Sequence, residues 1–181
     1  VENGIASVRI HGPLMRQPDL FSVLLFGATD MNLVADAVGE AVAREDVEAL
    51  LLDIDSPGGT VNGTPELAQV VADASKLKTV YDFRAGQMRS AAYWIASGVG
   101  NEIVVPPMGQ VGSIGTIGVW LDRTGELAER GIEAHVVRDP AGKAAGHPAG
   151  PVAEVADERL TGLVREATAT FVEAVASRRP I

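Results

Sequence analysis

Short apolar runs alternate along the chain with segments whose apolar residues recur at helical spacing. The runs are rich in Val, Ile and Leu, which is typical of strands in a parallel sheet. Strands that alternate with helices form βαβ units, so we expect an α/β fold, a mostly parallel sheet covered by helices. The expected strands are residues 5–10, 49–54, 79–83, 102–105, 116–121 and 132–137.

Helices are expected between and after these strands. Residues 32–44 carry an apolar stripe at helical spacing. Thr64 and Pro65 supply an N-cap and a first-turn proline for the next helix. Residues 122–130 form a shorter helix, and the apolar stripe of residues 152–177 either covers the core or meets another subunit.

The composition narrows the possible classes of function. A chain of 181 residues is long enough for one hydrophobic core, so we expect a single domain over residues 1–181. The net charge of −9 argues against a nucleic-acid partner, because phosphate binding depends on clustered Lys and Arg. The lack of cysteine excludes a thiolate nucleophile.

The two ends of the chain and its apolar runs bear on its place in the cell. No apolar run approaches the roughly 20 residues that span a bilayer, and the first residues lack the layout of a signal peptide. Because the chain begins at Val1 and stops just after a helical pattern, we expect a fragment or processed core of a longer protein. Any flanking anchor or tail would then lie outside the given residues.

Ser90 is a candidate nucleophile. It follows an expected loop at residues 84–88 and precedes an Ala-rich amphipathic segment that ends at Ser97. A helix N-terminus places backbone N–H groups and partial positive charge beside the hydroxyl. From these residues alone, an ordinary N-cap serine is the commoner interpretation.

A glycine pair, Gly58 and Gly59, follows the apolar run at residues 49–54. Two glycines let the backbone turn sharply and approach a bound peptide closely. Without further context the segment is a good turn and nothing more.

Lys143 is a candidate base. The other lysines are Lys76 and Lys78, at a helix end that looks exposed, and arginine is the usual cation of this chain. Lysine, unlike arginine, can give up its proton when it is buried, and the small neighbours at 142, 144 and 145 would permit burial. A solvated loop lysine is the alternative.

Other chemistry is less well supported. Asp53 and Asp55 alternate at a strand end, which is more often a solvated turn than a metal site, so no metal and no cofactor is expected. The glycines at 112, 115 and 118 depart from the G-x-G-x-x-G spacing of a dinucleotide loop, and an apolar run follows them rather than a helix. The histidines at 11, 135 and 147 are the candidates for a Ser-His-Asp triad.

Four segments in this order resemble the signal peptide peptidase A and phage protease C family of serine peptidases, whose fold is shared with ClpP and the crotonases. The likeness runs from about residue 4 to 179. Relatives of the ClpP type place a histidine about 25 residues after the serine, and this chain has none there. The segments are 52–59 (LDIDSPGG), 88–97 around Ser90, 111–115 (VGSIG) and 138–148 around Lys143.

The resemblance implies a role for each site residue. Ser90 would be the nucleophile, Lys143 the base, and Ser113 the auxiliary serine that orients the lysine. The family has small residues before the nucleophile, where this chain has Met88 and Arg89. The role of Arg89 is therefore open: it could contact an acidic substrate residue, help to repel a proton from Lys143, or point to solvent. By the same resemblance the oxyanion donors are the N–H groups of Gly59 and Ala91, and the substrate-binding residues are Gly58, Thr60 and Arg89.

The expected function is a serine endopeptidase with a Ser-Lys dyad. The opening residues 10–14 and the run from Ser90 to Trp94 favour the phage branch, whose substrates are scaffold, portal or capsid proteins in the host cytoplasm or prohead. Members of the family form homo-oligomeric rings, some with active sites shared between protomers. The alternatives are a membrane-associated signal peptide peptidase, a non-catalytic capsid-assembly protein, and a crotonase-like acyl-CoA enzyme, which would need an adenine pocket.

Overall fold

The structure is a computed structural model that describes residues 1–99, 103–150 and 154–179. The chain divides into two units. The first consists of residues 1–115 and 169–181, and the second of residues 116–168. The single domain expected over residues 1–181 stays a prediction.

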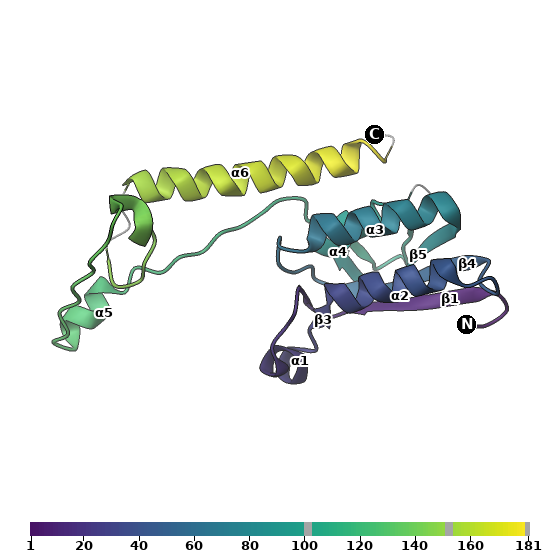
Figure 1. The fold of residues 1–181 in the computed structure, drawn as a ribbon, viewed down its shortest axis with the longest axis horizontal. Coiled ribbons are helices and arrows are strands. Elements are labelled where there is room, and N and C mark those ends of the chain that lie inside the picture. The colour runs from purple at the N-terminus through teal and green to yellow at the C-terminus, as the bar shows by residue number, and fades with distance from the viewer. Residues whose placement is uncertain (100–102, 151–153, 180–181) are drawn as a thin grey trace. The chain divides into compact units, whose positions relative to one another are not determined.

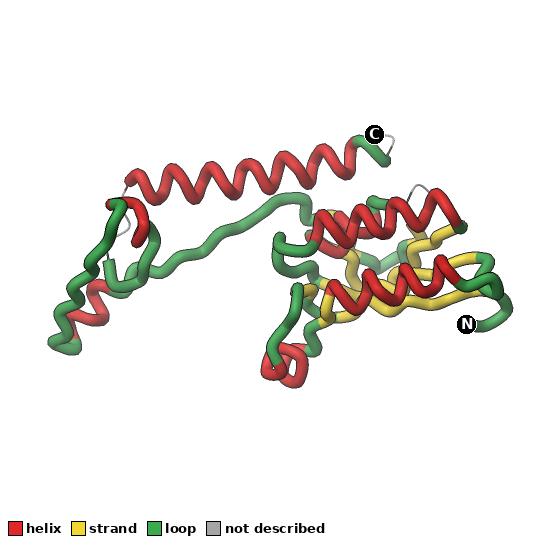
Figure 2. Tube along the Cα trace, in the orientation of Figure 1, coloured by secondary structure: helices red, strands yellow, loops and turns green. Residues whose placement is uncertain are grey.

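A five-stranded parallel sheet forms the centre of the first unit (Figure 2, yellow). Its order is β1–β4–β5–β6, and β7 also pairs with β5, farther along that strand. This confirms the expected mostly parallel sheet. The strands are β1 (Ile5–His11), β4 (Ala49–Ser56), β5 (Thr79–Arg89), β6 (Ile103–Val104) and β7 (Gln110–Gly112). Residue 102, expected to begin a strand, lies outside the described residues.

Two of the helices, α2 (Met31–Ala43) and α3 (Thr64–Leu77), lie side by side over this sheet (Figure 1). The helix α4 (Ala91–Ala96) packs against α3. Strand β4 alternates fully buried and half-buried residues, so one face of the sheet carries the core. Burying one leucine side chain there contributes about 1.5–3 kcal/mol. The residues at the centre of this core are Leu50, Leu52, Ile54, Val38, Leu67, Val71 and Ile95.

The first unit also contains an excursion between β1 and α2. It consists of β2 (Leu14–Met15), α1 (Leu20–Phe26) and β3 (Thr29–Asp30), with β2 and β3 paired in parallel. The Asp19 side chain accepts a hydrogen bond from the Ser22 N–H and caps α1. None of the α1 side chains is buried. The sequence pattern did not predict this helix.

Two boundaries differ from the expectation. Thr64 is the first residue of α3 rather than its N-cap, which is Gly63 at φ 94°. Thr64 Oγ1 instead donates to the Thr60 carbonyl at 2.7 Å. The expected loop at 84–88 is strand, because β7 pairs with the end of β5 and keeps it extended as far as Arg89.

The expected strands at 116–121 and 132–137 do not form (Figure 2). A strand persists only where a neighbour accepts its backbone hydrogen bonds, and the described residues provide no such ladder for either segment. Most of their apolar side chains are exposed: Ile117 is 89% and Val137 97% exposed, whereas Trp120 and Val136 are half-buried.

The second unit contains α5 (Thr124–Glu129), the 3-10 turn η1 (Ala141–Ala144) and the first part of α6 (Glu154–Ala176). Residues 169–176 of α6 belong to the first unit, where Phe171 and Val175 are buried in the core. The apolar stripe of this helix therefore covers the core at these two positions. No helix in the described residues is both long and apolar enough to cross a membrane.

Candidate active site

Ser90 lies between the end of β5 and the start of α4. Its backbone has φ 51° and ψ −124°, a conformation that costs a non-glycine residue about 1–3 kcal/mol. Two hydrogen bonds hold it there: Ser90 N–H donates to the Gly112 carbonyl at 2.8 Å, and Trp94 N–H donates to the Ser90 carbonyl at 3.0 Å. The Ser90 hydroxyl makes no helix-capping bond, so the ordinary N-cap interpretation does not describe it.

Gly58 packs directly on Ser90. A Cβ added to Gly58 would lie 2.6 Å from the Ser90 Cβ and 2.9 Å from the Arg89 carbonyl oxygen. On the other side of the same loop, a Cβ on Gly59 would lie 1.8 Å from the Leu14 carbonyl oxygen. Both positions therefore require glycine.

The segment around Leu14 holds this glycine loop in place. Leu14 N–H donates to the Gly58 carbonyl at 2.9 Å, and Thr60 N–H donates to the Leu14 carbonyl at 2.9 Å. The result is a short parallel bridge between Leu14 and Gly59. Sequence reasoning did not single out Leu14, whose role arises from its backbone rather than from its side chain.

Two backbone donors beside Ser90 are available to a ligand. Gly58 N–H is occupied, since it donates to Ser56 Oγ at 3.1 Å. Within the described part of the chain, neither the Gly59 N–H nor the Ala91 N–H donates to a protein acceptor. Paired, unoccupied N–H groups beside a hydroxyl are what an oxyanion hole requires.

Ser113, Arg89 and Thr60 lie around this centre. Ser113 follows Gly112, whose carbonyl accepts from Ser90 N–H, and it has φ 57°. Arg89 is exposed, and its Nη1 lies 3.4 Å from Gln110 Oε1. The structure thus brings Ser113, Arg89 and Thr60 to the neighbourhood of Ser90, together with the glycine loop.

Lys143 belongs to the second unit, where it lies in η1 with an exposed side chain. The partner of Lys76 is Asp73, 2.6 Å away. Lys78 is half-buried rather than exposed, because its Nζ donates to the carbonyls of Ala41 and Val47 near the end of α2. Within the described residues Lys143 alone among the lysines has an ammonium without a hydrogen bond or ion pair. Its pairing with Ser90 stays a prediction.

The histidines have other neighbours. His11 Nε2 lies 3.2 Å from Asp53 Oδ2, and His135 Nε2 lies 3.7 Å from Glu133. His147 Nδ1 accepts from the Ala149 N–H. No hydrogen bond joins any of them to Ser90 among the described residues, so the triad alternative gains no support.

Asp55 lies within β4. Its position had suggested a solvated turn at the end of the strand, and the structure shows no such turn at this residue. Its carboxylate is half-buried and accepts from the Gln87 N–H at 2.8 Å. This bond joins β4 to the part of β5 that leads to Ser90. Asp55 therefore supports the strand that leads to Ser90.

Asp82 and Arg179 are two further residues that the sequence analysis missed. Asp82 is fully buried in β5, and its Oδ2 lies 3.8 Å from Arg179 Nη2. Burial raises the pKa of Asp82 to about 8, and the nearby Arg179 opposes that rise. The available signal was the alternation of β5, which places Asp82 on the same face as the buried Val80.

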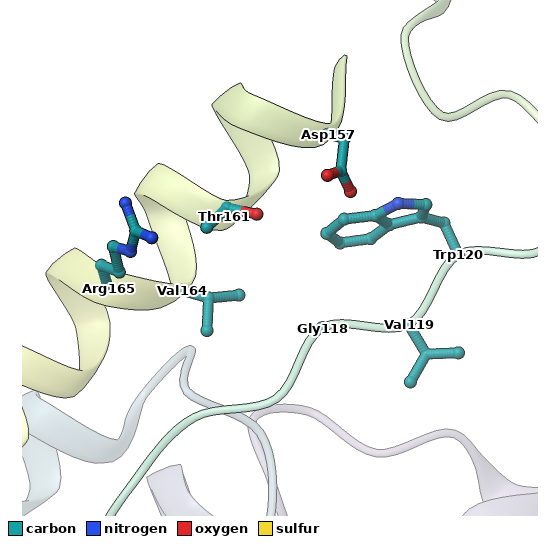
Figure 3. A pocket seen from close by; sticks show the side chains of 7 residues that line it. All are labelled: Gly118, Val119, Trp120, Asp157, Thr161, Val164 and Arg165. Atoms are coloured by element: carbon teal, nitrogen blue, oxygen red, sulfur yellow. The ribbon is translucent and has the colours of Figure 1, made fainter. Parts of the chain in front are cut away.

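The second unit contains a cavity of about 400 Å³ (Figure 3). Segment 118–120 lines one side of it and α6 the other, with the Trp120 ring beside Asp157. None of the predicted site residues lines this cavity. The lining residues are Gly118, Val119, Trp120, Asp157, Thr161, Val164 and Arg165.

Comparison with known proteins places these segments in context. The model of peptidase family S49 matches residues 72–181, which include Ser90, Ser113 and Lys143. The chain is 27% identical over 148 residues to capsid assembly protease C of Escherichia phage lambda, covering 82% of this chain and 33% of that protein. It is 31% identical over 181 residues to the Na(+)/H(+) antiporter NhaA of Brucella melitensis biotype 1, covering 99% of this chain and 24% of that protein. The chain therefore spans a third or less of the length of these curated relatives.

A solved structure shares the fold. An alanine mutant of the 1510-N membrane-bound stomatin-specific protease superposes with a TM-score of 0.50 at 11% identity, over 98% of this chain and 72% of that chain. The likeness concerns the fold alone. It agrees with the ClpP/crotonase-like, mostly parallel α/β architecture expected from the sequence.

Proposed function

Since this chain belongs to peptidase family S49, we propose that it is a serine endopeptidase with Ser90 as nucleophile and Lys143 as general base. The observation that carries the proposal is the arrangement at the start of α4. There the strained Ser90 stands beside the N–H groups of Gly59 and Ala91, neither of which donates to an acceptor among the described residues. The proposal is also supported by the uncapped Ser90 hydroxyl and by the Lys143 ammonium, which has no partner within the described part of the chain.

The reaction would proceed through an acyl-enzyme. Ser90 Oγ attacks the peptide carbonyl carbon while neutral Lys143 takes the hydroxyl proton. The C–N bond then breaks, and the lysine returns the proton to the leaving amine. Water, deprotonated by the same lysine, attacks the ester carbonyl. The C–O bond to Ser90 then breaks, and the lysine gives its proton to Ser90 Oγ, which releases the acid product and restores neutral Lys143. Ser113 would orient the lysine amine.

The oxyanion donors stabilise the charge that develops on the carbonyl oxygen. Gly59 and Ala91 would each donate one hydrogen bond, and losing one such donor costs about 3–4 kcal/mol of transition-state stabilisation. Both are backbone groups, so their positions depend on the glycine loop and on α4. This explains why the site needs glycine at 58 and 59, where any side chain would clash.

The substrate would be an extended peptide. The glycine loop presents Gly59 and Thr60 at the surface, where main-chain hydrogen bonds can hold an added strand. Gly58 and Thr60 would line this strand, and the exposed Arg89 would meet a substrate side chain at its rim.

The likeness to a phage capsid assembly protease favours a role in head maturation. The substrates would then be scaffold, portal or capsid proteins, cut in the host cytoplasm or the prohead by a homo-oligomeric ring. Removal of signal-peptide remnants at a membrane is the alternative. A capsid-assembly protein without activity would keep the fold but not react at Ser90.

Reaction with a fluorophosphonate probe, read by intact mass, tests the proposal. We expect one adduct on the wild type, none on Ser90→Ala, and strongly reduced labelling of Lys143→Ala. Size-exclusion chromatography of each variant records its assembly state. A folded and assembled wild type that takes no label at Ser90 would overturn the proposal and favour the non-catalytic assembly protein.

A further inference from the structure

The C-terminal end of α6 packs on the helix that follows Ser90. Phe171 stacks on Trp94 of α4, with ring centroids 4.7 Å apart and 8° between the ring planes. Phe171 is 2% and Trp94 4% exposed, so the stack is part of the core. Trp94 also donates its N–H to the Ser90 carbonyl, which places the stack one turn from Ser90.

Arg179 joins the other end of α4. Its Nη2 donates to the carbonyl of Ala96, the last residue of α4, at 3.2 Å. The same nitrogen lies 3.8 Å from Asp82 Oδ2. The Arg179 side chain is 19% exposed and Asp82 is fully buried, so this contact is largely removed from solvent.

The helix α4 depends on such support. It has six residues, and an isolated helix of that length is unstable because it makes too few hydrogen bonds to offset the cost of nucleation. Yet its first turn supplies the Ala91 N–H and fixes Ser90 at φ 51°. A strained residue persists only where its surroundings hold it.

We propose that Arg179 is a positioning residue. It holds α4 through its contacts with the Ala96 carbonyl and the buried Asp82, and so keeps Ser90 and the Ala91 N–H in their positions relative to each other. The inference rests on the proposed role of Ser90. Arginine suits this position, because its planar guanidinium carries several donors and can face a carboxyl group and a carbonyl at once. Lysine could keep the charge and one of the two contacts.

The neighbouring Arg178 is a matched control. Its Nη2 donates to Gln69 Oε1 on α3 at 3.0 Å, and no described contact of its side chain reaches α4. Arg178→Ala and Arg179→Ala therefore remove the same side chain from adjacent positions at the end of the chain. They differ in which helix loses a contact.

The test compares Arg179→Ala, Arg179→Lys and Arg178→Ala with wild type in the whole 181-residue chain. The rate of fluorophosphonate labelling is measured as a function of probe concentration, which gives the probe affinity and the maximal acylation rate separately. The temperature is one at which circular dichroism shows each variant to be folded. We expect Arg179→Ala to lower the maximal acylation rate roughly tenfold or more with unchanged probe affinity. Arg179→Lys should recover part of the loss, and Arg178→Ala should stay within about twofold of wild type.

Amide hydrogen exchange across residues 91–97 supplies a second readout that needs no activity. We expect faster exchange there in Arg179→Ala than in Arg178→Ala. Equal exchange in the two variants, or wild-type acylation by Arg179→Ala, would overturn the positioning role. If the wild type itself takes no label while exchange follows the expected pattern, the proposed function fails and the support of α4 by Arg179 stands.

Discussion

Gly58 packs directly against Ser90, with room for hydrogen but not for a methyl group between the two residues. A Cβ at Gly58 would lie 2.6 Å from the Ser90 Cβ, and the backbone of Gly58 has φ 103°. Contact distance and backbone conformation thus both restrict this position to glycine. The loop that would carry the oxyanion hole and the residue that would attack the substrate form one packed unit.

Gly58→Ala should therefore abolish labelling at Ser90 and destabilise the fold by about 1–3 kcal/mol, because the new methyl group displaces Ser90 or the loop. Urea denaturation and intact mass measure the two effects. Gly39→Ala is the control: Gly39 lies within α2, and an added Cβ meets nothing within 4 Å. That variant should label normally and gain about 0.5–1 kcal/mol. Normal labelling of Gly58→Ala would contradict the packing.

The buried Asp82 should make stability depend on pH. Its pKa is about 8 in the folded chain, above the roughly 3.9 of an unfolded aspartate. Between these values the folded state keeps a proton that the unfolded state has released. The free energy of unfolding therefore falls as pH rises from about 4 to about 8, by up to about 1.4 kcal/mol per pH unit from this group.

Asp82→Asn should remove that contribution, since asparagine is neutral throughout. Thermal melting from pH 5 to pH 8.5 should show a gap between Asp82→Asn and wild type that widens in favour of the variant as pH rises. Asp36→Asn, on the exposed side of α2, should melt in parallel with wild type. A gap that stays constant with pH would argue against a raised pKa at Asp82.

Phe171→Ala should cost about 3–5 kcal/mol, because it leaves a cavity against the buried Trp94 ring. Val172→Ala is the neighbouring control, since Val172 is 49% exposed. Its effect should lie within about 0.5 kcal/mol. Chemical denaturation of both variants checks the difference, and equal stabilities would mean that the end of α6 does not pack on α4.

Lys78→Met should destabilise the chain, because the ammonium of Lys78 satisfies backbone carbonyls of Ala41 and Val47 near the end of α2. Losing a charge-assisted hydrogen bond of this kind costs about 1–3 kcal/mol. Lys76→Met, whose exposed ammonium pairs only with Asp73 among the described residues, should change stability little. The melting temperatures of the two variants test this prediction. A larger fall in melting temperature for Lys76→Met than for Lys78→Met would contradict it.

Much of the first unit follows from local pattern. The apolar runs at 5–10 and 49–54 and the helical stripe at 32–44 form β1, β4 and α2 within one or two residues, because burial of one face selects the element. The segments at 116–121 and 132–137 carry the same kind of run but form no strand. A strand depends on a partner, and no local pattern specifies one.

At the site, the chemical groups available can be read from the residues alone: a serine at a helix start, a glycine pair after a strand, and a lone loop lysine in a chain otherwise rich in arginine. Three features depend on the folded chain: Gly58 packs on Ser90, the Gly59 and Ala91 N–H groups find no acceptor among the described residues, and Arg179 reaches Ala96 and Asp82. Residues 83 positions apart, such as Ala96 and Arg179, meet only when the core forms, because contact between distant segments depends on packing rather than on local preference.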